Sequence, residues 1–305
     1  MMMLLILINL IFLILMILVS VAYLTLLERK LLSYIQFRKG PNKVGFLGIL
    51  QPFSDGVKLL TNESMFFNKM NLFYYYFCPV IIFFISLMLW CLFPYYYNLL
   101  SLNLGVLLFF CILSLNVYPI MIMGWSSNSI YASLGSLRGI AQTISYEISL
   151  ILLFISLLVL IEKFNLMYFL YYQKYMFIFM VSIGIFLMML ISLLAELNRT
   201  PFDLLEGESE LVSGFNIEYM SGGFALIFLG EYSNIIFLMM IFSLMNFYFM
   251  MFYFFWLLMI FFVVWIRGVL PRIRYDNLMY MVWLVFLPNS LNYLILFFCL
   301  KFMII

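Results

Sequence analysis

The stretch MLLILINLIFLILMILVSVAYLTLL, residues 3–27, decides the fold class of this chain. It contains no charged residue, and it is longer than the roughly 20 apolar residues that a helix needs to cross a hydrocarbon layer of ~30 Å. Comparable apolar stretches follow at residues 71–93, 99–123, 138–161, 174–195, 219–243, 248–267 and 279–301. We therefore expect about eight membrane-spanning helices.

The composition of the whole chain supports the same fold class. Hydrophobic residues make up 68% of the 305 residues and charged residues only 9%, whereas a soluble domain has roughly 45–50% apolar residues. The polar and apolar alternation of a membrane β-barrel is absent, so internally hydrogen-bonded helices remain. The sequence predicts an all-α, polytopic membrane helix bundle, with residues 1–305 as a single transmembrane domain.

Several kinds of chemistry are excluded by what the chain lacks. It contains no His, and its four cysteines, Cys78, Cys91, Cys111 and Cys299, are scattered through apolar stretches without a CxxC spacing. This pattern argues against haem, an iron–sulfur cluster or a zinc site on this chain. No basic tract suggests nucleic acid. If the protein takes part in redox chemistry, another chain must carry the electrons.

The distribution of basic residues gives the orientation in the membrane. Of the fifteen Lys and Arg residues, the expected loops on one side hold twelve. The other side holds Lys163, Lys174 and Lys301. Because basic loops stay on the cytoplasmic or matrix side, we expect both termini on the opposite face.

Two loops carry local signals. After the first span, an apolar stripe with helical spacing predicts an amphipathic helix at the membrane surface, in which Pro52 either makes a kink or marks a second start. The stripe consists of Phe46, Ile49, Leu50, Phe53, Val57 and Leu60, opposite Gln51, Asp55 and Lys58. Further on, residues 124–137 are rich in Ser, Asn and Gly, and we expect a loop there.

Three acids fall within or at the end of apolar spans: Glu147, Glu196 and Glu231. A charged carboxylate at bilayer depth costs ~3 kcal/mol on insertion scales, so such acids mark proton or ligand pathways by default. Two structural alternatives stay open: Glu147 as a protonated carboxyl bonded between helices, and Glu196 as the partner of Arg199 in a salt bridge at a helix end. The position of Glu196 near the same leaflet as Glu147 favours a joint role.

The segment after Glu196 concentrates acids in an otherwise uncharged chain. Residues 200–203, TPFD, have the chemistry of a helix start, so Asp203 is expected to be structural. Glu206, Glu208 and Glu210 stand at alternate positions and repel one another. They suit a water-filled entry or a basic partner surface, although a solvated loop face is the alternative.

Three groups of motifs carry a resemblance that covers the whole chain. The first is ERK at 28–30, RKGPNKVG at 38–45 and QPFSDG at 51–56; the second is AELNRTPFD at 195–203 and EGESELVSGFNIEY at 206–219; the third is RIRYD at 272–276. These motifs resemble those of the subunit 1 family of mitochondrial NADH:ubiquinone oxidoreductase, respiratory complex I.

The resemblance implies a core membrane subunit at the junction of the membrane and peripheral arms. Such a subunit forms much of the quinone-access tunnel and an acidic path that couples quinone reduction to proton translocation, with ubiquinone as the substrate. FMN and the iron–sulfur clusters would lie on partner subunits. The expected partners are the other membrane and peripheral-arm subunits and phospholipid. The expected location is the mitochondrial inner membrane, with both termini on the intermembrane-space side.

The resemblance also assigns roles to residues of this chain. It implies a quinone tunnel lined by Arg29, Asp55 and Phe224, with Glu206 and Glu208 near the cavity. It implies proton coupling through Glu147, Glu196, Glu210 and Glu231. For Arg272 and Arg274, which flank a basic turn, membrane anchoring is the first interpretation and partner docking the second.

Other functions remain open on the sequence. A stand-alone ion-coupled transporter would place Glu147 and Glu231 in a midplane site; discontinuous helices or repeated halves would support it, and the sequence shows neither. The related subunit of an ion-pumping hydrogenase-type complex would share the fold. A third alternative is a purely structural anchor for the peripheral arm.

Overall fold

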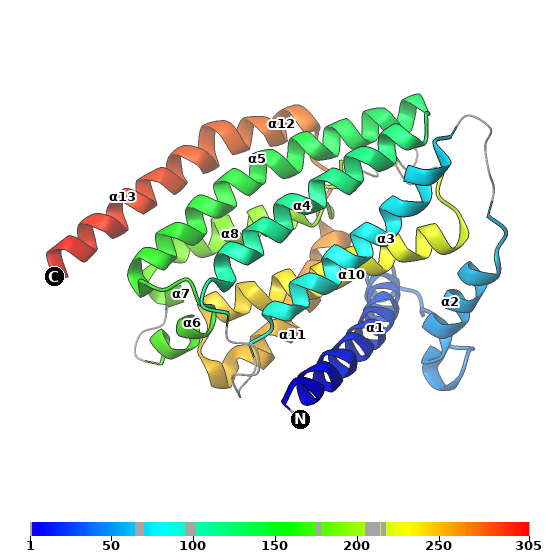
Figure 1. Ribbon diagram of the computed structural model, residues 1–305, viewed down its shortest axis with the longest axis horizontal. Coiled ribbons are helices and arrows are strands. Elements are labelled where there is room, and N and C mark those ends of the chain that lie inside the picture. The colour runs from blue at the N-terminus through cyan, green and yellow to red at the C-terminus, as the bar shows by residue number, and fades with distance from the viewer. Residues whose placement is uncertain are drawn as a thin grey trace.

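The computed structural model describes residues 2–64, 70–94, 102–174, 178–204, 214 and 218–304. Within these ranges the chain forms helices and no strand (Figure 1). The α-helices are α1 (Met2–Ile35), α2 (Gln51–Thr61), α3 (Leu72–Leu89), α4 (Gly105–Ser126), α5 (Ile130–Ile161), α6 (Met167–Tyr172), α7 (Ile178–Val181), α8 (Ile183–Glu196), α10 (Ser221–Asn246), α11 (Phe249–Val269), α12 (Tyr275–Met281) and α13 (Leu287–Ile304). Two 3₁₀ turns, η1 (Phe46–Gly48) and η2 (Trp90–Leu92), and a π-helical segment, η4 (Val282–Phe286), complete the helical elements.

The helices confirm a polytopic membrane bundle, with one departure from the expected spans. In the described part of the chain, seven helices are long and apolar enough to cross a membrane. The expected fifth span, residues 174–195, is interrupted at Ser182, where φ is −138°. The continuous part, α8, has 14 residues and a length of roughly 21 Å, which is less than the hydrocarbon thickness. The expectation that no helix is discontinuous is therefore wrong.

The expected loop at residues 124–137 is also wrong. α4 continues to Ser126 and α5 already begins at Ile130. A Cβ atom on Gly124 would lie 2.0 Å from Ser136 Oγ, so these small residues allow α4 and α5 to approach closely. Small residues serve this purpose between membrane helices, and here they resemble turn residues only in composition.

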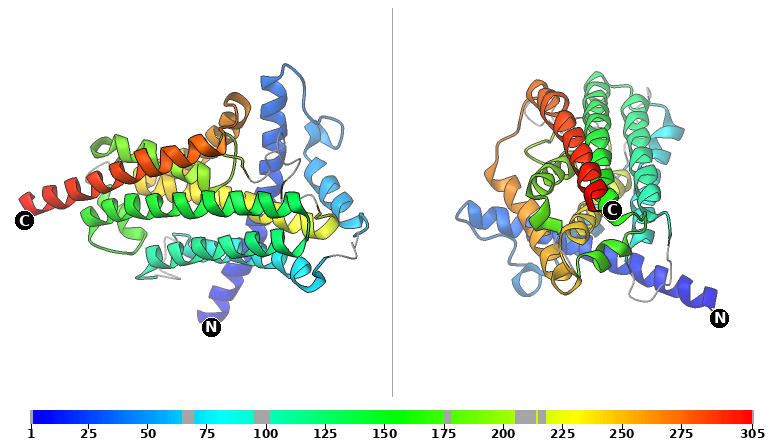
Figure 2. Two further views of the ribbon diagram at one scale, coloured as in Figure 1. Left: turned by 90° about the horizontal axis from the view of Figure 1, so that it is seen from above. Right: turned by 90° about the vertical axis from the view of Figure 1, so that its left-hand side faces the viewer.

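The most buried helix of the bundle is α10. It packs against α3, α11, α2 and α1, while α1 crosses the other long helices steeply (Figure 2). A Cβ atom on Gly230 would lie 2.8 Å from Ile82 Cγ2, so α10 and α3 are in close contact at this position. The next residue, Glu231, therefore stands beside the packed interior rather than at a helix end.

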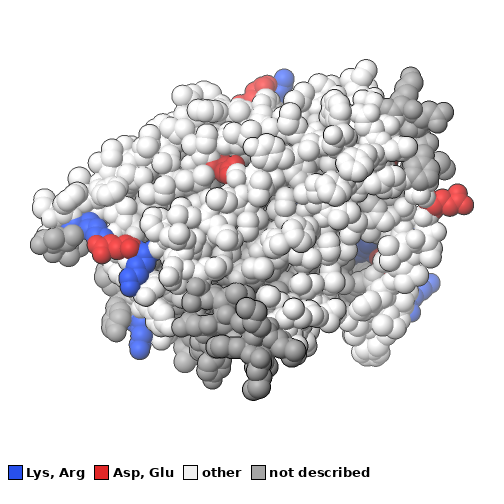
Figure 3. Space-filling view, in the orientation of Figure 1, with Lys and Arg blue, Asp and Glu red and all other residues white. Residues whose placement is uncertain are grey.

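The surface fits an apolar environment. Charged side chains are sparse on the face seen in Figure 3, and large apolar side chains are exposed along most of the long helices. Among them are Phe53, Val57 and Leu60 of α2, which form the exposed apolar face expected of the surface helix. Pro52 lies in the first turn of α2, so it marks a helix start rather than a kink.

Candidate functional site

A cluster of charges lies inside the bundle, where α1, α10 and α11 meet the turn after α8. We call Glu28, Arg199, Tyr232 and Arg267 the charged cluster. Glu28 has a side-chain exposure of only 8% and forms an ion pair with Arg267. Its Oε1 atom lies 3.9 Å from Arg199 Nη1, and its Oε2 atom accepts a hydrogen bond of 2.5 Å from the Tyr232 hydroxyl.

The charged cluster carries more positive than negative charge. One carboxylate, Glu28, faces the guanidinium groups of Arg199 and Arg267. The guanidinium carbon of Arg199 also lies 4.4 Å above the ring of Tyr232, where the face of the aromatic ring attracts a cation. Because buried charges interact strongly, this cluster can stabilise negative charge that develops on a ligand nearby.

Beside the charged cluster is a polar cavity of about 50 Å³. Its walls come from α3, α4, α10, α11 and the segment after α8. Its polar lining consists of Asn116, Glu196, Asn198, Arg199, Thr200, Asp203, Glu231, Asn234 and Arg267. Because one water molecule needs roughly 10–15 Å³ by this measure, the polar cavity has room for a few.

Several atoms in the wall of the polar cavity have no hydrogen-bond partner among the described residues. They are Asn116 Oδ1, Glu196 Oε2, Asn198 Oδ1, Thr200 Oγ1 and Asn234 Oδ1. Buried polar atoms are normally paired with protein or with ordered water. The polar cavity combines such atoms with sufficient room, which is the condition for bound water.

The charged cluster and the polar cavity share two side chains. Arg199 and Arg267 line the polar cavity, and both also surround Glu28 together with Leu24 and Tyr232. The two arginines thus form the wall between Glu28 on one side and Glu196 and Glu231 on the other. A change of charge on either side acts on the same guanidinium groups.

Glu147 lies outside the lining of the polar cavity but close to Glu196. It is half-buried on α5, and its carboxyl group interacts electrostatically with that of Glu196 on α8. α5 and α8 are in contact along this face. The structure therefore brings the three acids of the apolar spans into one series, with Glu231 and Glu196 in the polar cavity and Glu147 beyond it.

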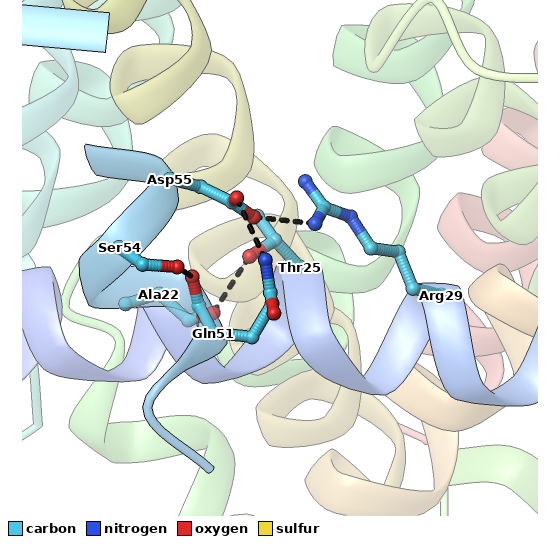
Figure 4. Close-up of polar contacts among 6 residues, drawn as sticks. All are labelled: Ala22, Thr25, Arg29, Gln51, Ser54 and Asp55. Carbon is cyan, nitrogen blue, oxygen red and sulfur yellow. Dashed lines mark hydrogen bonds and ion pairs between the residues drawn. The ribbon is translucent and has the colours of Figure 1, made fainter. Parts of the chain in front are cut away.

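A second ionic site joins α1 to the surface helix. Arg29 forms an ion pair with Asp55 of α2, and Gln51 Nε2 donates a hydrogen bond of 3.0 Å to Asp55 Oδ1 (Figure 4). These side chains are partly exposed. The structure thus brings together two of the three residues expected in the quinone tunnel.

The third, Phe224, begins an aromatic stripe on α10. Its ring centroid lies 4.3 Å from that of Phe228, which in turn lies 6.1 Å from that of Tyr232. Residues four apart share one face of a helix, so the stripe leads along α10 to the charged cluster. Phe224 is therefore connected to Glu28 through a tilted ring pair, a stacked ring pair and the hydroxyl group of Tyr232.

The segment after α8 departs from the expectation. Thr200 to Leu204 form turns rather than a helix, so the expected helix start at residues 200–203 is wrong. The Asp203 carboxylate instead lies 3.1 Å from Arg272 Nη2. Glu206, Glu208 and Glu210 lie outside the described residues.

The two basic residues of the last loop differ from one another. Arg272 is partly buried by its ion pair with Asp203 within the chain. Arg274 is largely exposed and lies 3.1 Å from the equally exposed Asp276. The second guanidinium is the more exposed of the two, and the docking role of both residues stays a prediction.

Sequence reasoning missed the centre of the charged cluster. In the interpretation based on the sequence, Glu28, Tyr232 and Arg267 receive no role. An acid followed by two cations at the end of the first span, ERK at residues 28–30, was the available signal. A membrane anchor needs only the cations, so the carboxylate required a separate explanation.

Comparisons with known proteins identify the family. Residues 8–298 match the family described as NADH dehydrogenase. NADH-ubiquinone oxidoreductase chain 1 of Aedes aegypti is 56% identical over 94% of this chain and 93% of its own. The proteins of the same name from Locusta migratoria and Apis mellifera ligustica are 54% identical, over 95% of this chain and 93% of theirs, and 49% identical, over 97% and 98%.

Proposed function

The chain belongs to the NADH dehydrogenase family, and from this premise we propose that it forms the quinone-binding membrane subunit of NADH:ubiquinone oxidoreductase. The enzyme is the multi-subunit complex, and this chain contributes a binding site and a charge path to it. Ubiquinone would be its substrate. FMN and iron–sulfur clusters would be carried by the peripheral-arm subunits.

A path for a quinone is supported by the contacts of α1, α2 and α10, which pack against one another in pairs. Tyr23 of α1 and Phe53 of α2 form an edge-on aromatic pair at the surface, with centroids 6.2 Å apart. The aromatic stripe that starts at Phe224 continues inward. An apolar tail suits such walls, while Arg29, Asp55 and the charged cluster offer partners for a polar headgroup. We also assign Glu206 and Glu208 to this proposed quinone path.

The proposed coupling is supported by one observation: Arg199 and Arg267 line both the polar cavity and the space around Glu28. Reduction of a quinone changes its charge until protons arrive. A unit charge at ~8 Å contributes roughly 2 kcal/mol at an effective dielectric constant near 20, which is enough to redistribute charge among the carboxylates beyond the arginines. Glu231 and Glu196 would respond first, and Glu147 would pass the response to neighbouring membrane subunits. Glu210 belongs to the same proposed path.

The proposed environment follows from this role. The complex would lie in the mitochondrial inner membrane, with phospholipid around the exposed helices and both termini of this chain on the intermembrane-space side.

Arg272 and Arg274 would face the peripheral arm. Arg274 is the more exposed of the two, so it is the stronger candidate for a contact between subunits.

The interruption at Ser182 is the observation that favours a transporter, since transporters place discontinuous helices at their ion sites. Here the interruption lies away from the acids. Ser182 Oγ donates to Ile178 O at 2.9 Å within its own segment, and Ser182 does not line the polar cavity. Glu147 and Glu231, the acids of that alternative, lie on the uninterrupted helices α5 and α10.

Replacing Asp55 separates a quinone wall from a structural anchor. We expect Asp55→Asn to leave the complex assembled and to lower NADH oxidation by ubiquinone severalfold, because it removes the charge that pairs with Arg29 and a partly exposed ion pair contributes up to ~1 kcal/mol. NADH oxidation by ferricyanide, which needs no quinone site, should be unchanged. Both rates and native gel electrophoresis of the complex check this.

Ser54→Ala is the matched control, because within the described part of the chain Ser54 Oγ bonds only to the Gln51 carbonyl of its own helix, at 2.8 Å (Figure 4). It should behave as the unaltered complex does. Loss of assembly in Asp55→Asn would support an anchor instead, and normal ubiquinone reduction would remove Asp55 from the proposed tunnel.

A further inference from the structure

Gln142 makes two hydrogen bonds that have no role in the proposed function as described above. Its side chain is fully buried in α5, with an exposure of 0%. Its Nε2 atom donates to the carbonyl oxygen of Ala195 and to that of Phe202, each at 2.8 Å. Both amide N–H groups of one side chain are therefore engaged by backbone carbonyls.

The two acceptors bracket the segment that forms one wall of the polar cavity. Ala195 directly precedes Glu196, and Phe202 directly precedes Asp203. Between them, Glu196, Leu197, Asn198, Arg199 and Thr200 all line the polar cavity. We call residues 196–201 the cavity segment. Its two ends are tied to the same point on α5 by Gln142.

Besides Gln142, other contacts hold the cavity segment: Pro201 O accepts a hydrogen bond of 2.9 Å from Ile273 N, and Arg199 is held by Glu28 and Tyr232. The cavity segment follows the end of α8, where helix carbonyls lack intrahelical partners, and it is not itself helical beyond its first residue. Among the described residues, Glu196 Oε2, Asn198 Oδ1 and Thr200 Oγ1 make no hydrogen bond. Apart from Arg199, the polar side chains that face the polar cavity therefore add little to hold the segment, and the bonds from Gln142 join both of its ends to one side chain.

We propose that Gln142 is a positioning residue for the coupling path. It sets where Glu196 stands relative to Glu231 and Glu147, without touching the quinone or the water of the polar cavity. This inference rests on the proposed function. Two carbonyls require two N–H donors, which an amide supplies without burying a charge, and an ionised carboxylate at position 142 would repel both.

The chain offers a matched control in Gln173. This side chain is also buried, with an exposure of 1%, and its Nε2 atom donates to two backbone carbonyls, those of Leu244, at 3.2 Å, and of Met245. It fixes the C-terminal end of α10 and does not line the polar cavity. Gln142 and Gln173 therefore differ in location rather than in the bonds they make.

The test compares Gln142→Met with Gln173→Met in the assembled complex, reconstituted into sealed vesicles. Methionine keeps the length of the side chain and removes both donors. We expect Gln142→Met to lower the number of protons translocated per NADH oxidised by roughly twofold or more, in line with the range of coupling effects from residues outside both sites. The pH profile of ubiquinone reduction should also shift. Gln173→Met should change neither, although both variants lower the thermal stability of the complex.

Equal proton yields and equal pH profiles in the two variants would overturn the inference. If Gln142→Met does not assemble, Gln142→Asn takes its place, because its shorter amide can reach one carbonyl but not both; the same fall in proton yield is expected. If neither Gln142→Met nor Gln142→Asn assembles, the inference is also overturned, because Gln142 would then be a purely structural residue.

Glu196→Gln, measured in parallel, keeps the inference distinct from the proposed function. A reduced proton yield in Glu196→Gln, with Gln142→Met equal to Gln173→Met, would leave the proposed function standing and reject the positioning role. A normal proton yield in Glu196→Gln would reject the acidic path itself, and with it any role in positioning Glu196.

Discussion

The two ends of the bundle hold charge in different ways. At the end that contains the charged cluster, Glu28, Glu196 and Asp203 are buried. At the far end, where α5 and α13 finish, Lys301 Nζ lies 2.5 Å from the exposed Glu162 and also donates to the Val159 carbonyl at 2.5 Å. At the far end, charge thus bonds a helix end at the surface of the bundle, whereas the other end also holds charge inside the bundle.

The two ends also differ in the free energy that the burial of their polar groups costs. Burying a charge costs several kcal/mol unless it is paired, and each unpaired buried polar atom costs about 1–3 kcal/mol. Unpaired atoms occur at the far end too, in Gln173 and Asn246, but neither side chain lines the polar cavity. Around the polar cavity the unpaired atoms face acids and a shared volume. A chain that selection had shaped for stability alone would not gather them, so this arrangement points to function.

Removal of the buried carboxylate should have the largest effect. Glu28→Gln removes the carboxylate that pairs with Arg267 and lies beside Arg199, and breaking a buried ion pair costs about 3–5 kcal/mol. We expect little assembled complex and little ubiquinone reduction, as seen by native gel electrophoresis and by turnover per assembled complex. Glu162→Gln, at the far end, is the control and should assemble normally. If Glu28→Gln and Glu162→Gln assembled equally well, the proposed difference between the two ends would be contradicted.

Replacement of Lys301, at the far end, should have the smallest effect. Lys301→Met breaks a partly exposed ion pair, which contributes at most ~1 kcal/mol, and frees one carbonyl at the end of α5. We expect a small fall in the thermal stability of the complex and no change in protons translocated per NADH oxidised. A loss of proton yield in Lys301→Met would show that charge at the far end is also part of the coupling path.

Much of the fold could be predicted because membrane helices follow from apolar length. The exceptions share one cause: composition does not say what a residue contacts. The small residues at 124–137 resemble a loop, yet Gly124 and Ser136 are packing partners. The interruption at Ser182 falls within an apolar run, where hydropathy gives no signal.

The candidate site could be predicted only in part, for a similar reason. Glu147 and Glu231 are conspicuous because they interrupt apolar spans, and Glu196 because it ends one. Glu28 and Arg267 are 239 residues apart, and each alone resembles an ordinary residue at a helix end. Gln142 is uncharged, so nothing in its surroundings in the sequence indicates that it reaches two backbone carbonyls of another segment.

The central claim is that charge in the quinone site reaches the acids of the polar cavity and drives proton translocation. The most direct test is the number of protons translocated per NADH oxidised by the Glu196→Gln complex in sealed vesicles. The account predicts that this complex assembles and translocates fewer protons per NADH than the unaltered complex. An assembled Glu196→Gln complex with an unchanged proton yield and an unchanged rate of ubiquinone reduction would contradict it.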